Sequence, residues 1–424
     1  MKTTRLYQQD RYIKEWDAQI TSVTEDNGSL IVTLDKSAFF PEGGGQSCDL
    51  GMMGGYEVID VQEKDEEVYH RVKPSSNEQT CAEGENSAGR KPAPLQEGDA
   101  VHCVLDWDRR FDNMQRHCGE HILSGIFFAL FGGVNRGFHM GQDYMTVDIS
   151  LEEDPDVKEI TYEDALRAEL EANKVIWADE PVTVMHFESR EEAEKMPLRK
   201  ALAFDEDITI VSVGSIENAA DCVACCGTHP NTAGQVGLIK IYKVENYKGM
   251  FRIYFEAGAR ALNDYRAKHN ILTELSNKYS SSIEDFPSKL RAQEEKLADA
   301  KGELHQIKKA FTDNECAKLD ALMAEAGDDS KVTVYEVEQL GLDDVFNMAK
   351  RYMGSCKGLI MLYSIKDTSY ILVSDGSIDC GGLVKEYASF YKGKGGGNKV
   401  SARGIFTSKE DAEMFADLVQ KHLK

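Results

Sequence analysis

Two short patterns of metal-binding residues, far apart in the chain, place the strongest constraint on the fold. His117 and His121 lie four positions apart in RHCGEHILSG, and Cys225 and His229 have the same spacing in DCVACCGTHP. On a helix, side chains four apart share one face, so two imidazoles can hold one ion. Three imidazoles and one thiolate are a donor set that zinc favours. The pairs together therefore predict a Zn²⁺ site and a fold that brings both stretches together.

The cysteines around the second pair leave alternatives open. Cys226 could replace Cys225 as the thiolate ligand, and Cys222 with Cys225 forms a C-x-x-C that is typical of redox sites or zinc half-sites. No second C-x-x-C accompanies it. Cys222 and Cys226 are therefore interpreted as fillers of the fold.

A competing motif overlaps the first pair. His117, Glu120 and His121 spell H-x-x-E-H, the signature of inverzincin proteases, in which Glu120 would be the general base. That interpretation needs a carboxylate as third ligand and gives CCGTH no role. A zinc protease is therefore the alternative hypothesis.

Composition indicates a globular cytoplasmic protein. The 424 residues suggest two to four domains, with 42% hydrophobic and 29% charged residues. The start of the chain lacks the apolar region of a signal peptide, and the apolar stretch 123–134 is too short to span a bilayer. The ten cysteines are therefore expected as thiols or ligands. The net charge of −24 disfavours nucleic-acid binding, although it does not determine what a local patch binds.

The pattern along the chain predicts a multidomain α+β fold. Short alternating strands predict a β-barrel-like domain in residues 1–107, with a polar loop at 75–98. An α/β zinc domain is expected in 108–262, and strands alternating with helices predict an α/β domain in 327–424. Residues 263–326 differ, because apolar residues there recur every seven positions. That row predicts a coiled coil or a helix packed on its own protein, and it consists of Ile283, Leu290, Leu297, Leu304 and Phe311.

Several segments resemble alanyl-tRNA synthetase. HCGEHILSG is similar to the H-x-x-x-H helix of its editing domain, and CCGTH to its C-G-G-T-H element. FFPEGGGQSCDLG resembles the glycine-rich motif of its N-terminal barrel, and GKGGGNKVSARG that of its DHH-associated C-terminal domain. GFHMGQDYMTVDI and the run 234–265 also match the editing domain. Departures are Cys226 in place of a glycine, Pro230 in place of a valine, and Glu120 where small or hydroxyl residues are common.

The resemblance implies a free-standing alanyl-tRNA editing hydrolase. Such a protein deacylates tRNA(Ala) mischarged with serine or glycine and does not charge tRNA, because no segment resembles an aminoacylation core. The resemblance places the zinc ligands on His117, His121, Cys225 and His229, as the spacing does. It also brings expectations of nucleotide and ATP binding, and of a homodimer through the coiled coil or the C-terminal domain. A tRNA-binding protein with a purely structural zinc is a further alternative.

Editing requires a pocket that accepts the hydroxyl of serine, and a polar pocket rejects the analogue that lacks it. His139, Gln142 and Thr228 are the predicted pocket residues, and Asp221 is a candidate partner for a ligand imidazole. Zinc would either lower the pKa of bound water or orient the substrate.

Two further sets of residues are predicted to contact tRNA. The backbone N–H groups of Gly43, Gly44, Gly45 and Gln46 could approach phosphate or the terminal ribose. A second, basic set lies among the glycines near the end of the chain and is expected to bind the tRNA backbone; it consists of Lys392, Lys394, Lys399 and Arg403.

Overall fold

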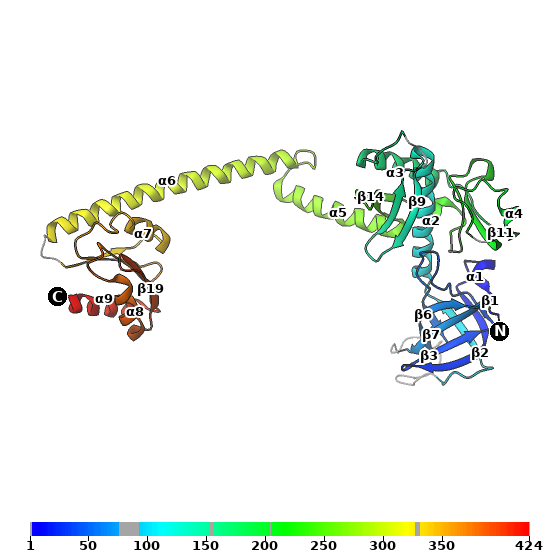
Figure 1. Cartoon of the computed structure of the whole chain (residues 1–424), viewed down its shortest axis with the longest axis horizontal. Helices are drawn as coiled ribbons and strands as arrows, with labels where there is room; N and C mark the ends of the chain where they lie inside the picture. Colours follow the sequence, from blue (N-terminus) through cyan, green and yellow to red (C-terminus); the bar gives the residue numbers. More distant parts are fainter. Residues whose placement is uncertain (1, 76–92, 153–155, 204, 327–330, 424) are drawn as a thin grey trace. The chain divides into compact units, whose positions relative to one another are not determined.

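The computed structural model describes residues 2–75, 93–152, 156–203, 205–326 and 331–423. They form two compact units, Met1–Glu274 and Leu275–Lys424, each with its own hydrophobic cores. The element order is shown in Figure 1. Most of the polar loop expected at 75–98 and the expected boundary near residue 327 lie outside the described residues.

The first part of unit 1 is a closed six-stranded barrel, with neighbouring strands in the order β2-β3-β7-β6-β5-β8. Alternation creates its interior: Trp16, Ala18 and Ile20 of β2 are buried, whereas the residues between them are exposed. A short segment precedes the barrel, in which β1 (Thr4–Arg5) pairs with β4 (Lys36–Ser37) beside α1 (Leu6–Gln9). The barrel strands are β2 (Glu15–Asp26), β3 (Ser29–Leu34), β5 (Gly51–Met53), β6 (Tyr56–Lys64), β7 (Glu67–Pro74) and β8 (Ala100–Leu105).

Helix α2 (Trp107–Phe131) follows the barrel directly and extends into the second core of unit 1. It begins where the Asp106 side chain accepts a hydrogen bond from the backbone N–H of Arg109, and ends at Gly132 in the left-handed conformation. Near its start, the fully buried Arg110 forms an ion pair with Asp49 and donates to the carbonyl of Ala38. The helix is therefore fixed to the barrel before it carries His117 and His121 onward.

Two antiparallel sheets surround the far end of α2. One has the strand order β14-β15-β10-β9 and packs its apolar face against α2 and α3, and the other has the order β11-β12-β13. The second pair of predicted ligands lies in the loop that follows β13. These elements are β9 (Val134–Met140), β10 (Met145–Ser150), α3 (Tyr162–Trp177), β11 (Val182–Ser189), α4 (Arg190–Ala193), β12 (Glu206–Val213), β13 (Asp221–Ala224), β14 (Ile239–Tyr247) and β15 (Met250–Ala257).

The heptad region is two helices, α5 (Gly258–Tyr279) and α6 (Phe286–Ala326), and Ile283 lies in the turn between them. Leu290, Leu297 and Leu304 of α6 are exposed, which fits a helix face that lacks its packing partner. Phe311 instead packs against a core of unit 2. The coiled coil therefore stays a prediction.

The rest of unit 2 is a five-stranded sheet with the order β16-β17-β18-β20-β19. Its central strands β17 and β18 are buried along their whole length, and β19 is an exposed edge strand. The elements are β16 (Val332–Val337), α7 (Leu342–Ala349), β17 (Leu359–Ser364), β18 (Ser369–Ser374), α8 (Cys380–Tyr387), β19 (Lys394–Gly397), β20 (Ser401–Ile405) and α9 (Lys409–Leu423).

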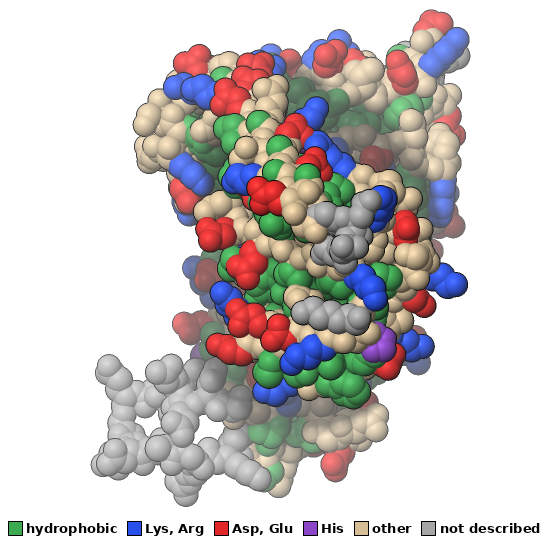
Figure 2. Space-filling view, turned by 90° about the vertical axis from the view of Figure 1, so that its left-hand side faces the viewer, with side chains coloured by type: hydrophobic (Ala, Val, Ile, Leu, Met, Phe, Trp, Pro, Cys, Tyr) green, Lys and Arg blue, Asp and Glu red, His purple; other side chains and the backbone are tan. Residues whose placement is uncertain are grey.

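Two surface observations bear on the partners of the chain. Among the described residues, every helix falls short of the length and apolar character that crossing a bilayer requires. On the face drawn in Figure 2, acidic and basic side chains are interspersed and do not separate into surfaces of one sign. On this face, contact with a polyanion would therefore need a local group of cations.

Candidate metal centre and adjoining cavity

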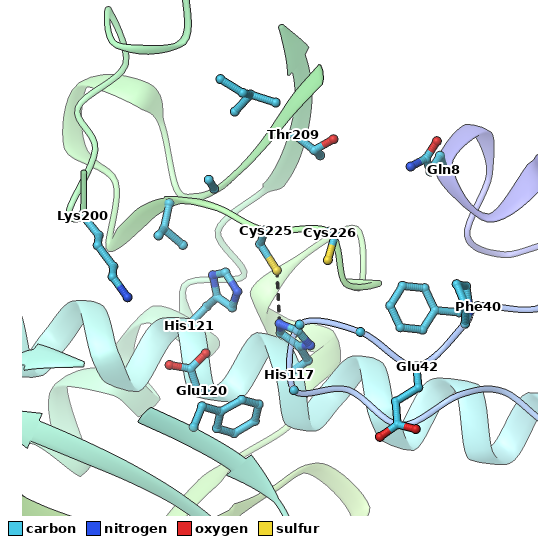
Figure 3. Close-up of a pocket in the computed structure, with 18 of the residues that line it drawn as sticks. Gln8, Phe40, Glu42, His117, Glu120, His121, Lys200, Thr209, Cys225 and Cys226 are labelled. Atoms are coloured by element: carbon cyan, nitrogen blue, oxygen red, sulfur yellow. Dashed lines mark hydrogen bonds between the residues drawn. The ribbon is translucent and has the colours of Figure 1, made fainter. Parts of the chain in front are cut away.

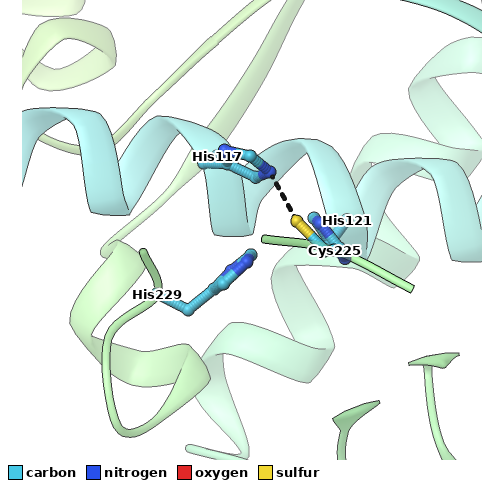
Figure 4. Close-up of side chains that lie close together, drawn as sticks. All are labelled: His117, His121, Cys225 and His229. Atoms are coloured by element: carbon cyan, nitrogen blue, oxygen red, sulfur yellow. Dashed lines mark hydrogen bonds between the residues drawn. The ribbon is translucent and has the colours of Figure 1, made fainter. Parts of the chain in front are cut away.

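The four predicted ligands converge. One donor atom from each of His117, His121, Cys225 and His229 can be chosen so that all four atoms lie within 4.8 Å of one another (Figure 4). Zinc bonds to nitrogen at about 2.0–2.1 Å and to sulfur at about 2.3 Å. Small side-chain movements would therefore bring all four donors onto one ion.

The two helix-borne histidines are held by hydrogen bonds on their outer nitrogens. Nδ1 of His117 donates to Oε1 of Gln46 at 3.1 Å, and Nδ1 of His121 donates to Oδ2 of Asp221 at 2.9 Å. Each bond keeps the proton on Nδ1 and leaves the lone pair of Nε2 for the centre of the cluster. The contact between Asp221 and His121 is the one that the sequence suggested.

Asp221 is itself held in place by Arg199. The Arg199 Nε donates to Asp221 Oδ1 at 2.5 Å, and both side chains are nearly buried. Burial alone would raise the pKa of the Asp221 carboxyl, but His121 and Arg199 hold it below its usual value. The carboxylate that orients His121 is therefore ionised.

Cys225 is the cysteine that reaches the cluster. Its Sγ lies 3.2 Å from Nε2 of His117, and the backbone N–H of Gly227 points at the same sulfur from 3.4 Å. Burial would raise the pKa of this thiol, but the neighbouring His117 and His121 hold it well below its ordinary value. Cys226 is exposed instead, and Cys222 is buried in a separate core.

His229 supplies the test of whether these residues fit a metal. The ring is fully buried, and among the described residues neither of its nitrogens has a hydrogen-bond partner. Burial lowers the pKa of His229 to about 3, so the ring is neutral and has a free lone pair. Buried polar atoms are rarely left without a partner. A metal ion bound to one ring nitrogen explains this one.

The turn between the two loop ligands has no room for a side chain. A Cβ on Gly227 would lie 2.4 Å from Cε1 of His117 and 3.0 Å from Oε1 of Gln46. The Gly in CCGTH therefore allows the loop to close over the His117 ring.

A cavity of about 810 Å³ opens beside the cluster (Figure 3). Its wall includes His117, His121 and Cys225, which places the metal donors at its surface. The barrel contributes the loop Gly43–Gly45, and α2 contributes Glu120 between the two histidines. This volume is in the range of ligand-binding pockets.

None of the three predicted pocket residues lies on the wall of this cavity. His139 and Gln142 are exposed beyond it, and Thr228 is buried behind the cluster, where its hydroxyl accepts from Nε2 of Gln46 at 2.8 Å. The side chains of β9 that do reach the cavity include Asn135 and Phe138. The role of these three residues in a pocket therefore stays a prediction, which the lining of this cavity does not support.

Gln46 has a different position from the one expected. Its side chain is buried and bonded to His117 and Thr228, and its backbone N–H, which was expected to approach phosphate, donates to the carbonyl oxygen of Gly43 at 2.9 Å. Gly43, Gly44 and Gly45 do face the cavity, and Gly44 and Gly45 have positive φ angles of 59° and 80°. A side chain is disfavoured at both positions.

The predicted basic cluster lies at the edge of the sheet in unit 2. Lys392, Lys394, Lys399 and Arg403 are all exposed, and among the described residues none has an ion-pair partner. Lys394 lies on the edge strand β19 and Arg403 on the adjacent β20. The four cations are thus accessible and not neutralised by neighbouring carboxylates.

Two residues of the site were not foreseen in their roles. Gln46 orients the imidazole of His117, and in the sequence only its position after three glycines indicated that it belongs to the site. Glu120 was noted as a departure and as a protease base, and the structure places its carboxylate on the cavity wall beside His121 (Figure 3). Ser124 lies four residues after Glu120 on the same helix, and this spacing could have indicated that its hydroxyl bonds to the Glu120 carboxylate.

Comparisons with known proteins agree with this architecture. The family described as "Threonyl and Alanyl tRNA synthetase second additional domain" matches residues 208–254, and the DHHA1 domain matches residues 329–424. The first match covers the strands and loop that carry Cys225 and His229, and the second covers the sheet of unit 2.

Several curated proteins are similar over long stretches. The alanyl-tRNA editing protein AlaX-L of Pyrococcus horikoshii is 29% identical over 431 residues, which cover 98% of each chain. AlaX-M of Methanosarcina acetivorans is 33% identical over 262 residues, which cover 60% of this chain and 98% of that protein. The alanine–tRNA ligase of Pyrococcus abyssi is 28% identical over 434 residues, but these cover only 44% of the ligase. The chain belongs to the family of alanyl-tRNA editing proteins.

Proposed function

We propose that this chain is a trans-editing hydrolase that deacylates tRNA(Ala) mischarged with serine or glycine. One observation carries the proposal: three imidazoles and one thiol, from two distant segments, converge at the wall of a cavity large enough for an aminoacyl ester. Membership in the editing-protein family supports tRNA(Ala) as the partner.

The proposed resident metal is zinc, held by His117, His121, Cys225 and His229. When bound, zinc supplies Lewis acidity, which lowers the pKa of a bound water or polarises the ester. Gln46 and Asp221 fix the two helix-borne imidazoles for this role. The glycine loop brings backbone groups of Gly44 and Gly45 to the cavity, where the terminal ribose would enter.

The protease hypothesis is weaker than the editing one. An inverzincin uses two histidines and a carboxylate as its zinc ligands, whereas this cluster contains a cysteine and a third histidine. Metal-edge absorption spectroscopy on the zinc-loaded protein tests the choice, because a sulfur ligand is incompatible with the protease set. The alternative of a tRNA-binding protein with a purely structural zinc is tested by the deacylation assay, because such a protein would hydrolyse no aminoacyl-tRNA.

The deciding experiment measures deacylation of Ser-tRNA(Ala), Gly-tRNA(Ala) and Ala-tRNA(Ala) by the wild type and by Cys225→Ala. We expect the wild type to hydrolyse the two mischarged tRNAs and spare the third, and the variant to be inactive. Cys226→Ala is the matched control, because that thiol lies outside the cluster. Equal turnover by the wild type and Cys225→Ala would overturn the proposal.

We also propose that Lys392, Lys394, Lys399 and Arg403 contact the tRNA backbone. Replacing the three lysines by glutamine should weaken tRNA(Ala) binding and reduce its salt slope by about one per lysine. Lysines paired with carboxylates, such as Lys308 with Asp344, provide the control position. Unchanged affinity at low salt contradicts this assignment.

No residue of the described chain argues for the expected ATP binding.

A further inference from the structure

Glu120 is a carboxylate on the cavity wall that the metal site does not use. It lies on α2 three residues after His117, a spacing that makes these two side chains neighbours on the helix, and it lines the same cavity wall as His117 and His121. Its side chain is only 5% exposed. The carboxylate is therefore held at the wall of the cavity close to the metal donors (Figure 3).

One oxygen of this carboxylate is fixed by the protein. Oε1 accepts hydrogen bonds from the hydroxyl of Ser124 and from Nδ2 of Asn135 at 2.6 Å, and Asn135 also donates to Ser124. Among the described residues, no hydrogen-bond donor is in reach of the other oxygen, Oε2. The side chain is thus anchored in one orientation with one acceptor left for another group.

The cations around the cavity do not fill that position. The charge of Arg199 interacts with Glu120, but its guanidinium is hydrogen-bonded to Asp221. The other two arginines of the wall are also bonded to carboxylates, Arg136 to Glu152 and Arg5 to Glu63. Lys200 is exposed at the cavity wall, and within the described part of the chain its ammonium forms no ion pair with a carboxylate. A carboxylate removed from water gains most from a cation that arrives with its own N–H donors.

An aminoacyl ester carries such a cation in a fixed place. Its α-ammonium group is attached to the carbon next to the ester carbonyl, so the two groups enter the cavity together. A carboxylate beside His121 can hold the ammonium while the ester lies at the metal donors. The spacing of Glu120 from the two histidines on one helix matches this requirement.

We propose that Glu120 is a specificity-determining residue that binds the α-ammonium group of the aminoacyl ester through Oε2. The inference rests on the proposed function and identifies the part of the substrate that every aminoacyl-tRNA shares. It assigns Ser124 and Asn135 as positioning residues, which hold Oε1. Recognition of the serine hydroxyl is left to other groups of the cavity.

The test compares substrates with and without the amine. Nitrous acid converts the α-amine of Ser-tRNA(Ala) to a hydroxyl, which yields the glyceroyl (2,3-dihydroxypropanoyl) ester with the same ribose linkage. For the full-length zinc-loaded protein we expect kcat/KM to fall about 10–100-fold on this change, the size of a hydrogen bond to a charged group. In Glu120→Gln this difference should disappear, because the amide can keep its bonds to Ser124 and Asn135 but has no charge.

Glu42→Gln is the matched control. Glu42 is another carboxylate on the same cavity wall, contributed by the barrel, and its side chain accepts from Gln62. This variant should keep the full preference for the amine. Zinc content and thermal stability of Glu120→Gln should equal those of the wild type, which excludes misfolding as the cause of its effect.

Binding provides a readout that does not need turnover. Calorimetry with the seryl amide of 3′-amino-3′-deoxyadenosine, and with the corresponding glyceroyl amide, measures recognition of the ammonium directly. We expect the wild type to prefer the seryl amide and Glu120→Gln to bind both equally.

Three outcomes would overturn the inference. If Glu120→Gln slows both esters equally and keeps the amine preference, Glu120 acts as a general base. If it changes the ratio of Ser-tRNA(Ala) to Gly-tRNA(Ala) hydrolysis but not the amine preference, it binds the serine hydroxyl. If the wild type binds both amides equally, no ammonium site exists. A wild type that hydrolyses neither ester yet prefers the seryl amide refutes the proposed function but not the ammonium site.

Discussion

His70 in the barrel and His229 beside α2 are both fully buried, but their hydrogen bonding differs. His70 donates from Nδ1 to the carbonyl of Val32 at 3.0 Å and accepts at Nε2 from the hydroxyl of Ser37 at 2.8 Å. Neither nitrogen of His229 has a partner among the described residues. Burial lowers the pKa of His70 to about 4 and that of His229 to about 3.

Burial and a low pKa therefore do not distinguish a core histidine from a metal ligand. The difference lies in the hydrogen bonds: both nitrogens of His70 have partners in the barrel, whereas neither nitrogen of His229 has one within the described ranges. An unsatisfied buried nitrogen costs free energy unless something outside the chain completes it. Four predictions test this contrast.

The largest effect is expected from His229→Ala. The variant should lose its zinc and its deacylase activity, by more than the roughly 10–100-fold that mutation of a ligand's supporting residue costs in metal affinity. Zinc is measured by metal analysis after dialysis. His70→Ala is the control and should destabilise the barrel while keeping one zinc per chain; zinc loss in both variants would remove the contrast.

The next prediction concerns pH. The folded-state pKa of His70 is about 4 against an ordinary 6.5, so the folded protein binds fewer protons than the unfolded chain between these values. Stability is therefore full above pH 6.5 and falls as the pH drops to 4, by up to about 3 kcal/mol. Urea unfolding at a series of pH values, compared between the wild type and His70→Gln, should show a shallower slope for the variant. Identical slopes would show that His70 does not titrate in this way.

A smaller effect is expected from Asp221→Asn. The amide keeps the shape of the side chain but loses the charge that orients His121 and pairs with Arg199, so zinc affinity should fall about 10–100-fold. Competition with a chromophoric chelator measures it. Asp207→Asn is the control, since Asp207 also lies at the cavity but pairs with His186. Equal zinc affinity in the wild type and Asp221→Asn would mean that Asp221 does not support the ligand.

The smallest effect comes from making His70 resemble His229. Ser37→Ala removes the hydroxyl that His70 Nε2 accepts from and should cost about 1 kcal/mol of stability. Zinc binding should not change, because the barrel histidine has no neighbouring ligands. Chemical unfolding and metal analysis measure the two quantities, and zinc uptake at His70 would contradict the contrast.

The sequence was most informative where chemistry and spacing coincide. The two pairs identified the four donors that the structure brings together. The i, i+4 spacing places His117 and His121 on one face of α2, whereas Cys225 and His229 lie in a loop and were identified by residue type, because few residue types bind zinc. Alternating residues such as Trp16, Ala18 and Ile20 predicted barrel strands. Such patterns are local, so a single chain is sufficient to find them.

The pocket could not be predicted in this way. Polarity and a place in a segment similar to the editing domain point to His139 and Gln142, but neither residue lies on the wall of the cavity. His139 lies near the end of β9, and Gln142 follows that strand. Gln46 and Glu120 act through contacts across the fold, with His117 and Asn135 as their partners. Contacts between distant segments leave no periodic pattern in the sequence. For the same reason, the sequence does not reveal that His70 has hydrogen-bond partners and His229 has none among the described residues.

The bond from Gln46 to His117 has a consequence for engineering. The amide belongs to the barrel region, whereas the imidazole belongs to the helix that follows it. A residue of the barrel region therefore orients a candidate metal ligand of the next region. The segment that carries the candidate metal ligands therefore could not be moved to another protein without the barrel. Any shortened version of this protein would have to supply a substitute acceptor for Nδ1 of His117.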